Sequence, residues 1–183
     1  VGFKWVEKVY PLFDDAYLAV GIKYYNDVGA TNDTVFQIIS NDAEITTDVI
    51  IANSWRAGGQ WPIDVVLLDD NKFSIFYSTY KDSEHHVGAQ VFDFDGNKIG
   101  DEKFVGNSTS ALGGLSEVVS TADGFVLTYY NGNEIVISKY SHQFDQISVA
   151  KIDIEEAEYA GLDRLDVHKM EDEQNFILSW SQR

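Results

Sequence analysis

The chain contains no cysteine. This absence excludes disulfide bonds, thiolate metal sites and cysteine nucleophiles, and it leaves the compartment open. Proline occurs twice and methionine once in 183 residues. No apolar run approaches the roughly 18 residues of a membrane helix, so we expect no membrane span. No signal peptide is visible, and the first residue is Val1, which is typical of a mature form or an excised piece.

Basic side chains are few. Thirteen Lys and Arg stand against thirty Asp and Glu, which gives a formal net charge of −17. Such a surface repels phosphate backbones and anionic membranes, so nucleic acid is not an expected partner. A solvated acidic face is the plainest interpretation, and a capacity for cations is the alternative. Aromatic residues make up 14% of the chain, and together with 14 glycines they favour many short strands joined by tight turns.

A repeat of about 50 residues organises the chain. Residues 9–20, 65–77, 118–129 and 167–180 align as a short strand, an acidic turn and a second strand that alternates apolar with small or polar residues. The period of two puts one set of large residues on one strand face: Phe73, Ile75 and Tyr77, then Phe125, Leu127 and Tyr129, then Phe176, Leu178 and Trp180. The turns carry Asp14-Asp15, Asp69-Asp70, Asp123-Gly124 and Asp172.

A third strand follows three of these hairpins, at 34–40, 87–94 and 134–140, and each leads through a polar turn into a further apolar stretch. Four strands per unit are typical of a β-propeller blade. The fold class predicted is therefore all-β, a propeller-like array of about four blades in a single repeat domain. Its units are 1–8 (a partial blade strand), 9–54, 55–107, 108–163 and 164–183 (a partial blade). Residues 154–165 have helical character, enough for one turn between units.

Both chain ends fall inside a blade in this scheme. Residues 1–7 can be laid over the third strand at 87–93, so they would complete the last blade of a closed four-bladed ring. The alternative is a fragment of a larger propeller, and the sequence leaves both open.

The segment 53–105 resembles a repeat of large secreted bacterial proteins of the adhesin and hemolysin type, many of them calcium-binding. The similarity lies in Asn53, Gln60 and Pro62, in the hairpin at 65–77, and in the run 90–97 (Gln-Val-Phe-Asp-Phe-Asp-Gly-Asn). Tyr77 and Tyr129 stand where that family usually has Trp, which only Trp180 keeps. The resemblance implies a secreted or cell-surface β-module, and it carries no catalytic residues.

Two sets of residues are candidate sites. Oxygen donors at the first, third, fifth and ninth positions of one loop match the spacing of calcium loops: Asp93, Asp95, Asn97 and Asp101. Against calcium, Lys98 stands where such loops carry glycine, and Asp95-Gly96 is also an ordinary hairpin turn. The second set is a loop that could stack on a sugar ring, or whose tryptophans pack between blades: Trp55, Arg56, Gln60 and Trp61. The pair His85-His86 fits a solvated loop better than zinc, because adjacent residues of an extended chain point apart.

Two functions follow. The first is a non-catalytic extracellular module that displays loops for glycan or protein ligands, or serves as a scaffold within a larger polypeptide or assembly; calcium is the only cofactor that the sequence suggests. The second is a propeller-type polysaccharide hydrolase with paired carboxylates, for which the acidic turns at Asp69-Asp70, Asp123 and Asp172 would have to converge. No sialidase box, nucleophile elbow, phosphate-binding loop or zinc-protease motif is present, so a binding module is the favoured prediction.

Overall fold

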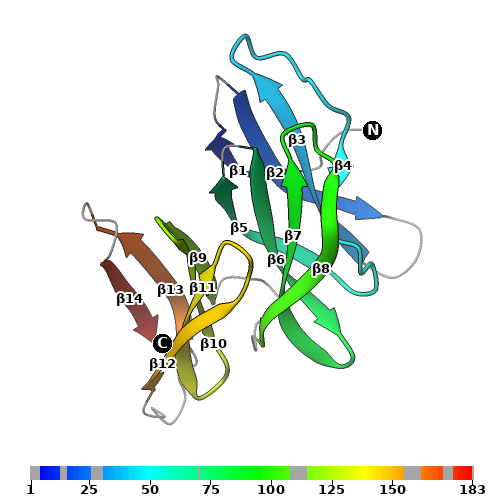
Figure 1. Cartoon of the computed structure of the whole chain (residues 1–183). Helices are drawn as coiled ribbons and strands as arrows, with labels where there is room; N and C mark the ends of the chain where they lie inside the picture. Colours follow the sequence, from blue (N-terminus) through cyan, green and yellow to red (C-terminus); the bar gives the residue numbers. More distant parts are fainter. Residues whose placement is uncertain are drawn as a thin grey trace.

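The computed structural model describes residues 5–12, 16–25, 31–69, 71–107, 115–154, 162–170 and 175–182. These residues form strands and turns only, arranged as four antiparallel sheets, which confirms the all-β prediction (Figure 1). Within this part of the chain, no helix reaches the length and apolarity that a bilayer crossing requires.

Three of the sheets share one topology, in which four consecutive strands lie side by side in chain order. Sheet A contains β1 (Trp5–Pro11), β2 (Ala16–Tyr25), β3 (Thr31–Ser40) and β4 (Ile50–Ile51). Sheet B contains β5 (Gln60–Asp69), β6 (Lys72–Lys81), β7 (Glu84–Asp93) and β8 (Lys98–Asn107). Sheet C contains β9 (Ser116–Thr121), β10 (Gly124–Tyr130), β11 (Glu134–Ser141) and β12 (Gln146–Asp153). Sheet D pairs β13 (Leu162–Lys169) with β14 (Phe176–Gln182).

The expected third strands coincide with parts of β3, β7 and β11, each paired with the second strand of its sheet, except that Phe94 lies in the turn after β7. The expected unit boundaries differ at two places. Residues 5–11 form one continuous strand, β1, which pairs with β2 from Trp5↔Ile22 to Pro11↔Tyr17, so a boundary after residue 8 would cut a strand. Residues 5–7 therefore belong to the first strand of sheet A and not to a third strand like 87–93. Residues 1–4 lie outside the described part.

Of the segment 154–165, expected to form one helical turn at most, residues 155–161 lie outside the described part, so the turn stays a prediction. Its last four residues belong to β13. Leu165 is 1% exposed and packs in a cluster with Ile135 of β11, so burial against sheet C and pairing with β14 favour a strand over residues 162–165. The boundary expected after residue 163 also falls inside β13.

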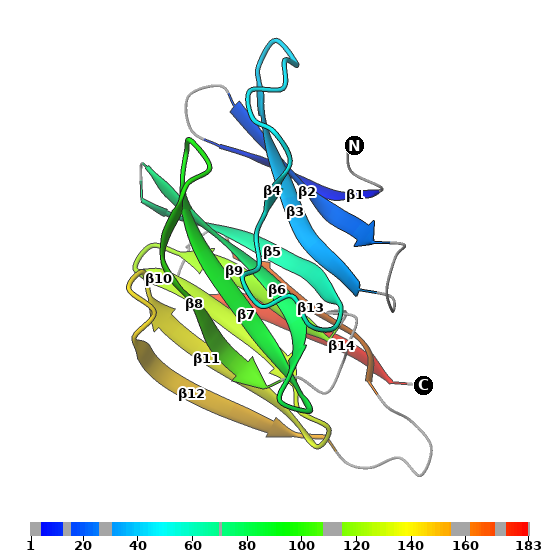
Figure 2. The same cartoon turned by 90° about the vertical axis from the view of Figure 1, so that its right-hand side faces the viewer.

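The apolar core lies between the sheets, in three clusters that each join two neighbours. The first joins sheets A and B through Leu18, Phe36, Ile75, Tyr77 and Phe92, among others. The second joins sheets B and C through Val66, Phe76, Phe125, Leu127 and others. The third joins sheets C and D through Ile135 and Leu165. Figure 2 shows sheet A above sheet B, with sheet C below it.

Strand β6 shows how alternation supplies two of these clusters. Phe73, Ile75 and Tyr77 have no exposed surface and pack against sheet A, as the period of two predicts. Phe76, which points to the opposite face, is buried against sheet C and meets Phe125 with ring centroids 5.0 Å apart. A strand covered on both faces carries apolar residues on both, and this is the pattern of β6.

The turns between third and fourth strands repeat one geometry. In each, one residue has a positive φ: Ala43 (61°), Gly96 (84°) and Phe144 (70°). Its N–H donates to the carbonyl of the residue three places earlier, at 3.0 Å, 3.1 Å and 3.0 Å respectively. Left-handed backbone favours glycine, so Ala43 and Phe144 take a strained conformation that the sheet on either side imposes.

Gly124 offers a test of the hairpin geometry. A Cβ on Gly124, whose φ is 157°, would lie 1.8 Å from the backbone oxygen of Tyr140 on the paired strand β11. We expect Gly124→Ala to lower the free energy of unfolding by about 2–3 kcal/mol, because the strand pair must part to admit the methyl group. Urea unfolding followed by tryptophan fluorescence measures it.

Gly100→Ala is the matched control, since Gly100 also has a positive φ (67°) but a Cβ there would meet nothing within 4 Å. It should cost about 1 kcal/mol, from backbone strain alone. Equal losses in the two variants would contradict the steric explanation.

Candidate functional site

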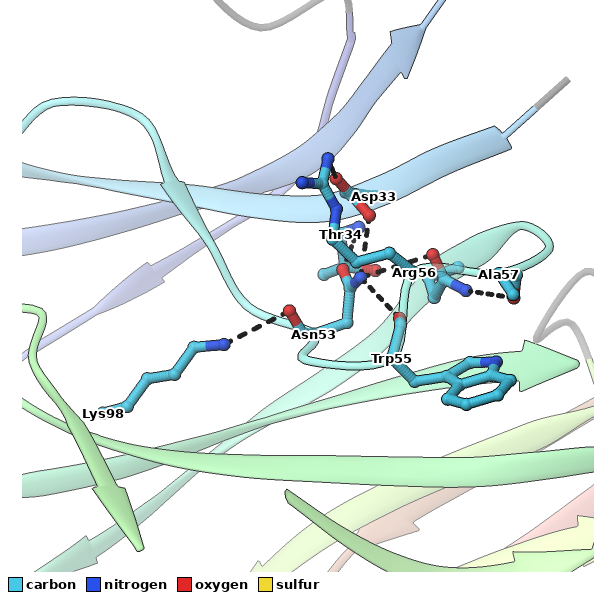
Figure 3. A network of polar contacts seen from close by, with 8 residues as sticks. Asp33, Thr34, Asn53, Trp55, Arg56, Ala57 and Lys98 are labelled. Carbon is cyan, nitrogen blue, oxygen red and sulfur yellow. Dashed lines mark hydrogen bonds and ion pairs between the residues drawn. The ribbon is translucent and has the colours of Figure 1, made fainter. Parts of the chain in front are cut away.

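Asn53, in the loop between sheets A and B, has a buried side chain whose hydrogen bonds join three segments (Figure 3). Its Oδ1 accepts the backbone N–H of Thr34 at 2.9 Å. Its Nδ2 donates to Asp33 Oδ1 (2.8 Å), to the Trp55 carbonyl (2.9 Å) and to Gln60 Oε1 (3.3 Å). A buried amide with every hydrogen-bonding group engaged fixes the loop to β3.

The same loop is held to β8 from the other side. Glu102 accepts the backbone N–H groups of Ser54 (2.9 Å) and Trp55 (3.1 Å) and the hydroxyl of Tyr77. Lys98 Nζ donates to the Asn53 carbonyl at 3.2 Å and to Ser54 Oγ at 3.0 Å. Burial and the nearby Glu102 carboxylate raise the pKa of Tyr77, so its hydroxyl remains a donor. The loop is thus a polar clamp across the seam between sheets A and B.

This clamp uses most of the groups expected to bind a sugar. Gln60 has no exposed surface, and its Nε2 donates to the Ala57 carbonyl (3.2 Å) and to Thr79 Oγ1 (3.3 Å). Arg56 pairs with the buried Asp33 at 2.7 Å and lies over the Tyr25 ring. The Arg56 side chain is 53% exposed, so part of the guanidinium still faces solvent.

The two tryptophans of this loop have different surroundings. Trp55 donates from Nε1 to the Tyr80 carbonyl at 3.1 Å, and the Lys81 ammonium lies 5.4 Å from its ring centroid. The Trp61 ring lies against Gly59, where a Cβ would be 2.1 Å from it. Both side chains are half-buried. All four side chains thus have contacts within the protein, and sugar binding at this loop stays a prediction.

At the calcium candidate, Asp93 already holds its own turn together. Asp93 Oδ1 accepts the backbone N–H groups of Asp95 (3.0 Å) and Asn97 (2.8 Å), and Oδ2 accepts Asn97 Nδ2 at 3.0 Å. These bonds lower the pKa of Asp93, with the Asn97 side chain as the largest cause. Among the described residues, no three His, Asp or Glu side chains gather as a metal site, and this includes Asp93, Asp95 and Asp101. Calcium binding by Asp93, Asp95, Asn97 and Asp101 stays a prediction.

His85, His86 and Asp123, from the histidine pair and the acidic turns, each contact a neighbouring side chain of the protein. His85 lies beside the Tyr80 ring, whereas His86 contacts Asn107 Oδ1 at 2.9 Å, so adjacent side chains meet different neighbours. Asp123 pairs with Lys139 at 2.9 Å in the hairpin of sheet C. Asp14, Asp15, Asp70 and Asp172, named in the sequence-based prediction, lie outside the described residues.

A second set of charged residues lies on the first strands of the four sheets. Each one directly precedes the valine with which the repeat begins: Lys8 on β1, Asp64 on β5, Glu117 on β9 and Asp166 on β13. We call these four residues, together with Arg164 on β13, the first-strand row. Three of these strands adjoin, since β5 contacts β9 and β9 contacts β13. From β1, the Lys8 side chain reaches Ile63 and Asp64 of β5.

Asp64 is largely buried, with 17% of its side chain exposed. Lys8 Nζ lies 3.8 Å from Asp64 Oδ2 and donates to the Ile63 carbonyl at 2.8 Å. Burial raises the pKa of Asp64, and Lys8 and the hydroxyl of Tyr10 oppose the shift. The carboxylate is therefore held between a cation and a phenol in a partly dry environment.

Glu117 is the most perturbed carboxyl group of the row. Burial raises its pKa to about 7, and the charges of Asp64 and Asp166 add to the shift while Lys8 and Arg164 oppose it. Asp166 itself is held by Arg164 at 2.6 Å. Charges from the other three sheets thus act on one carboxyl group of sheet C, and perturbed pKa values of this kind gather at functional sites.

The repeat alignment contained a signal for this row. The position before the first valine is charged in all four units, which is unusual for the start of a half-buried strand. The convergence of these positions, by contrast, depends on how the sheets pack.

Comparison with protein-family models, with curated proteins and with solved structures finds no match to this chain.

The clamp predicts a large loss of stability for Asn53→Ala. The substitution leaves the Thr34 N–H and the Gln60 and Asp33 side chains short of partners, so we expect a loss of about 2–4 kcal/mol in urea unfolding. Asn41→Ala, at an exposed turn position, is the control and should change stability by less than about 0.5 kcal/mol. A loss as small in Asn53→Ala would show that the clamp does not hold the seam.

The raised pKa of Glu117 makes stability fall with rising pH. The folded state keeps the proton until about pH 7, whereas the unfolded state releases it near 4.5, so between these values the folded state binds more protons and is destabilised as pH rises. Glu117→Gln removes this dependence. Relative to the wild type, the variant should gain roughly 1–3 kcal/mol in unfolding free energy between pH 5 and pH 8, measured by urea titration.

Glu134→Gln is the matched control for this pH series. Lys151 and Asn131 hold the pKa of Glu134 below its ordinary value, so its charge is not expected to change in the range where Glu117 titrates. Its difference from the wild type should stay constant from pH 5 to pH 8. A flat difference for Glu117→Gln as well would exclude a raised pKa at that position.

Proposed function

We propose that this chain is a non-catalytic binding module, built as a propeller-like array and acting outside the cell or at its surface. Support for the array comes from three sheets with one strand order and from the burial of each sheet's face against the next. In a propeller, the first strand of each blade lines the central axis, and ligands meet the ring there or at its loops. The extracellular location rests on the family resemblance.

The observation that carries the proposal is the first-strand row. Equivalent positions on four successive units each present a charged group, and the groups interact across the sheets. A single charged residue at a strand start is an ordinary surface feature, but a set that is repeated and partly buried needs compensation for its desolvation. A bound ligand that pairs with these groups supplies such compensation.

The chemistry of the row selects the ligand class. It contains the carboxylates Asp64, Glu117 and Asp166 and the cations Lys8 and Arg164. Carboxylates accept hydrogen bonds from sugar hydroxyls and pair with ammonium groups, whereas a chain of net charge −17 repels polyanions. The module therefore takes a neutral glycan or, preferably, an amino-sugar glycan, with the half-buried Tyr10 ring at the edge of the row as an aromatic contact.

A polysaccharide hydrolase is the second candidate, and Glu117 favours it. A carboxyl group with a pKa of about 7 can serve as a general acid near neutral pH, and its neighbour Asp64 is a second carboxylate. The assay for this function is the release of reducing ends from the glycan that binds. Turnover by the wild type that Glu117→Gln abolishes would replace the binding proposal with this one.

Binding is tested by calorimetry with three oligosaccharides of equal length: N-acetylglucosamine, its deacetylated amino sugar, and a uronic acid. We expect the amino-sugar chain to bind best and the uronate chain not to bind, because of the charge on the row. Glu117→Gln and Asp64→Asn should each weaken binding about tenfold, which corresponds to one lost charge-assisted contact.

Glu134→Gln serves as the control here too, because Glu134 pairs with Lys151 on the far strands of sheet C. Its affinity should equal that of the wild type. Absence of binding to all three glycans, or equal losses in all variants, would overturn the proposal.

A further inference from the structure

A pocket of about 310 Å³ lies at the seam between sheets B and C, where the β11–β12 turn meets β5, β7 and β8. Its apolar walls are Leu68, Val91, Ile99 and Phe144. Its volume is at the lower end of the range for small-molecule sites, which run from about 300 to 1,000 Å³. The pocket is separate from the first-strand row, none of whose members lines it.

Phe144 forms one wall in a strained conformation. Its φ is 70°, at a turn position that Gly96 occupies in sheet B and Ala43 in sheet A. The ring is held by contacts with Phe76 (centroids 6.0 Å apart) and Phe125 (5.0 Å). A large side chain at this position fills part of the seam and gives the pocket an aromatic wall, although glycine would suit the backbone of the turn better.

The polar lining of the pocket is basic. Lys72, Lys103, His142 and Gln143 line it, and it contains no Asp or Glu. The Lys103 ammonium lies 5.5 Å from the centroid of the Phe144 ring. Within the described part of the chain, neither Lys103 nor His142 has a carboxylate or other polar partner for its side chain. In a chain with 30 acidic and 13 basic residues, this local reversal of sign is a specific feature.

We infer that this pocket binds a small organic anion with an apolar body, such as an aromatic carboxylate. The carboxylate would meet Lys103 and His142 at the rim, and the ring would lie between Phe144 and the aliphatic side chains. Apolar walls with a few convergent polar groups are the usual composition of a ligand site. Lys103 is exposed, and its ammonium already lies over the aromatic face of Phe144, so it can pair with an anion at the rim of the pocket while the ring contact holds it there. The site and its ligand differ from the glycan proposal in place and in charge.

The probe is benzoate, with benzamide as its uncharged counterpart, titrated into ¹⁵N-labelled protein and followed by NMR chemical shifts. We expect saturable binding of benzoate with shifts confined to residues of the β11–β12 turn and the start of β8, and binding of benzamide at least about tenfold weaker. Lys103→Gln should weaken benzoate binding by about five- to tenfold, since it removes the charge and keeps a polar side chain of similar shape.

Two variants serve as controls. Lys151→Gln removes a lysine that pairs with Glu134 away from the pocket, and Glu117→Gln alters the first-strand row. Both should bind benzoate as the wild type does, so failure of the glycan proposal would leave this result unaffected. Benzamide binding as tightly as benzoate, a Lys103→Gln affinity equal to that of the wild type, or no saturation below about 10 mM would overturn the inference.

Discussion

Burial of each sheet's face against the next sheet is the constraint on which the structure depends. Within the described residues, the core has no part that belongs to one sheet alone: each of its three clusters draws side chains from two neighbours. Sheet B shows the consequence most clearly, because β6 buries Tyr77 on one face and Phe76 on the other. A unit of this kind gains its stability from its neighbours, as repeat proteins do.

Polar clamps complete these seams. The loop that carries Asn53 must pass from sheet A to sheet B through a region where its backbone and side-chain groups lose water. Asn53, Glu102 and Lys98 supply the missing partners, so that the connection is fixed without an additional apolar layer. Residues that resemble a recognition loop in the sequence, above all Gln60, are therefore largely engaged inside the protein.

The same packing determines where the two proposed sites lie. The first strands of sheets B, C and D adjoin, Lys8 of sheet A reaches β5, and the charges of these strands act on one another, most strongly at Glu117. At the outer part of the seam between sheets B and C, the turn of one sheet covers the apolar face of the next and leaves the basic pocket beside Phe144. The two proposed sites thus belong to one architecture: a row with three carboxyl groups and two cations at the first strands, and a basic pocket at a seam.

The amino-acid sequence by itself determined the strands, their alternation and their turns. The run Phe73, Ile75, Tyr77 and the third strands before residues 41, 95 and 145 could be read directly, because period-two burial and turn chemistry involve only residues close in the chain. The charged position before each repeat valine is also visible in the sequence, but the sequence does not show that these four residues lie close together. Tertiary structure alone decided that residues 5–11 form one strand paired with β2, that Gln60 is buried, and that Lys8, Asp64, Glu117 and Asp166 share one row. These outcomes depend on the angle and register at which one sheet packs on another, and they result from the fit of many side chains that are far apart in sequence.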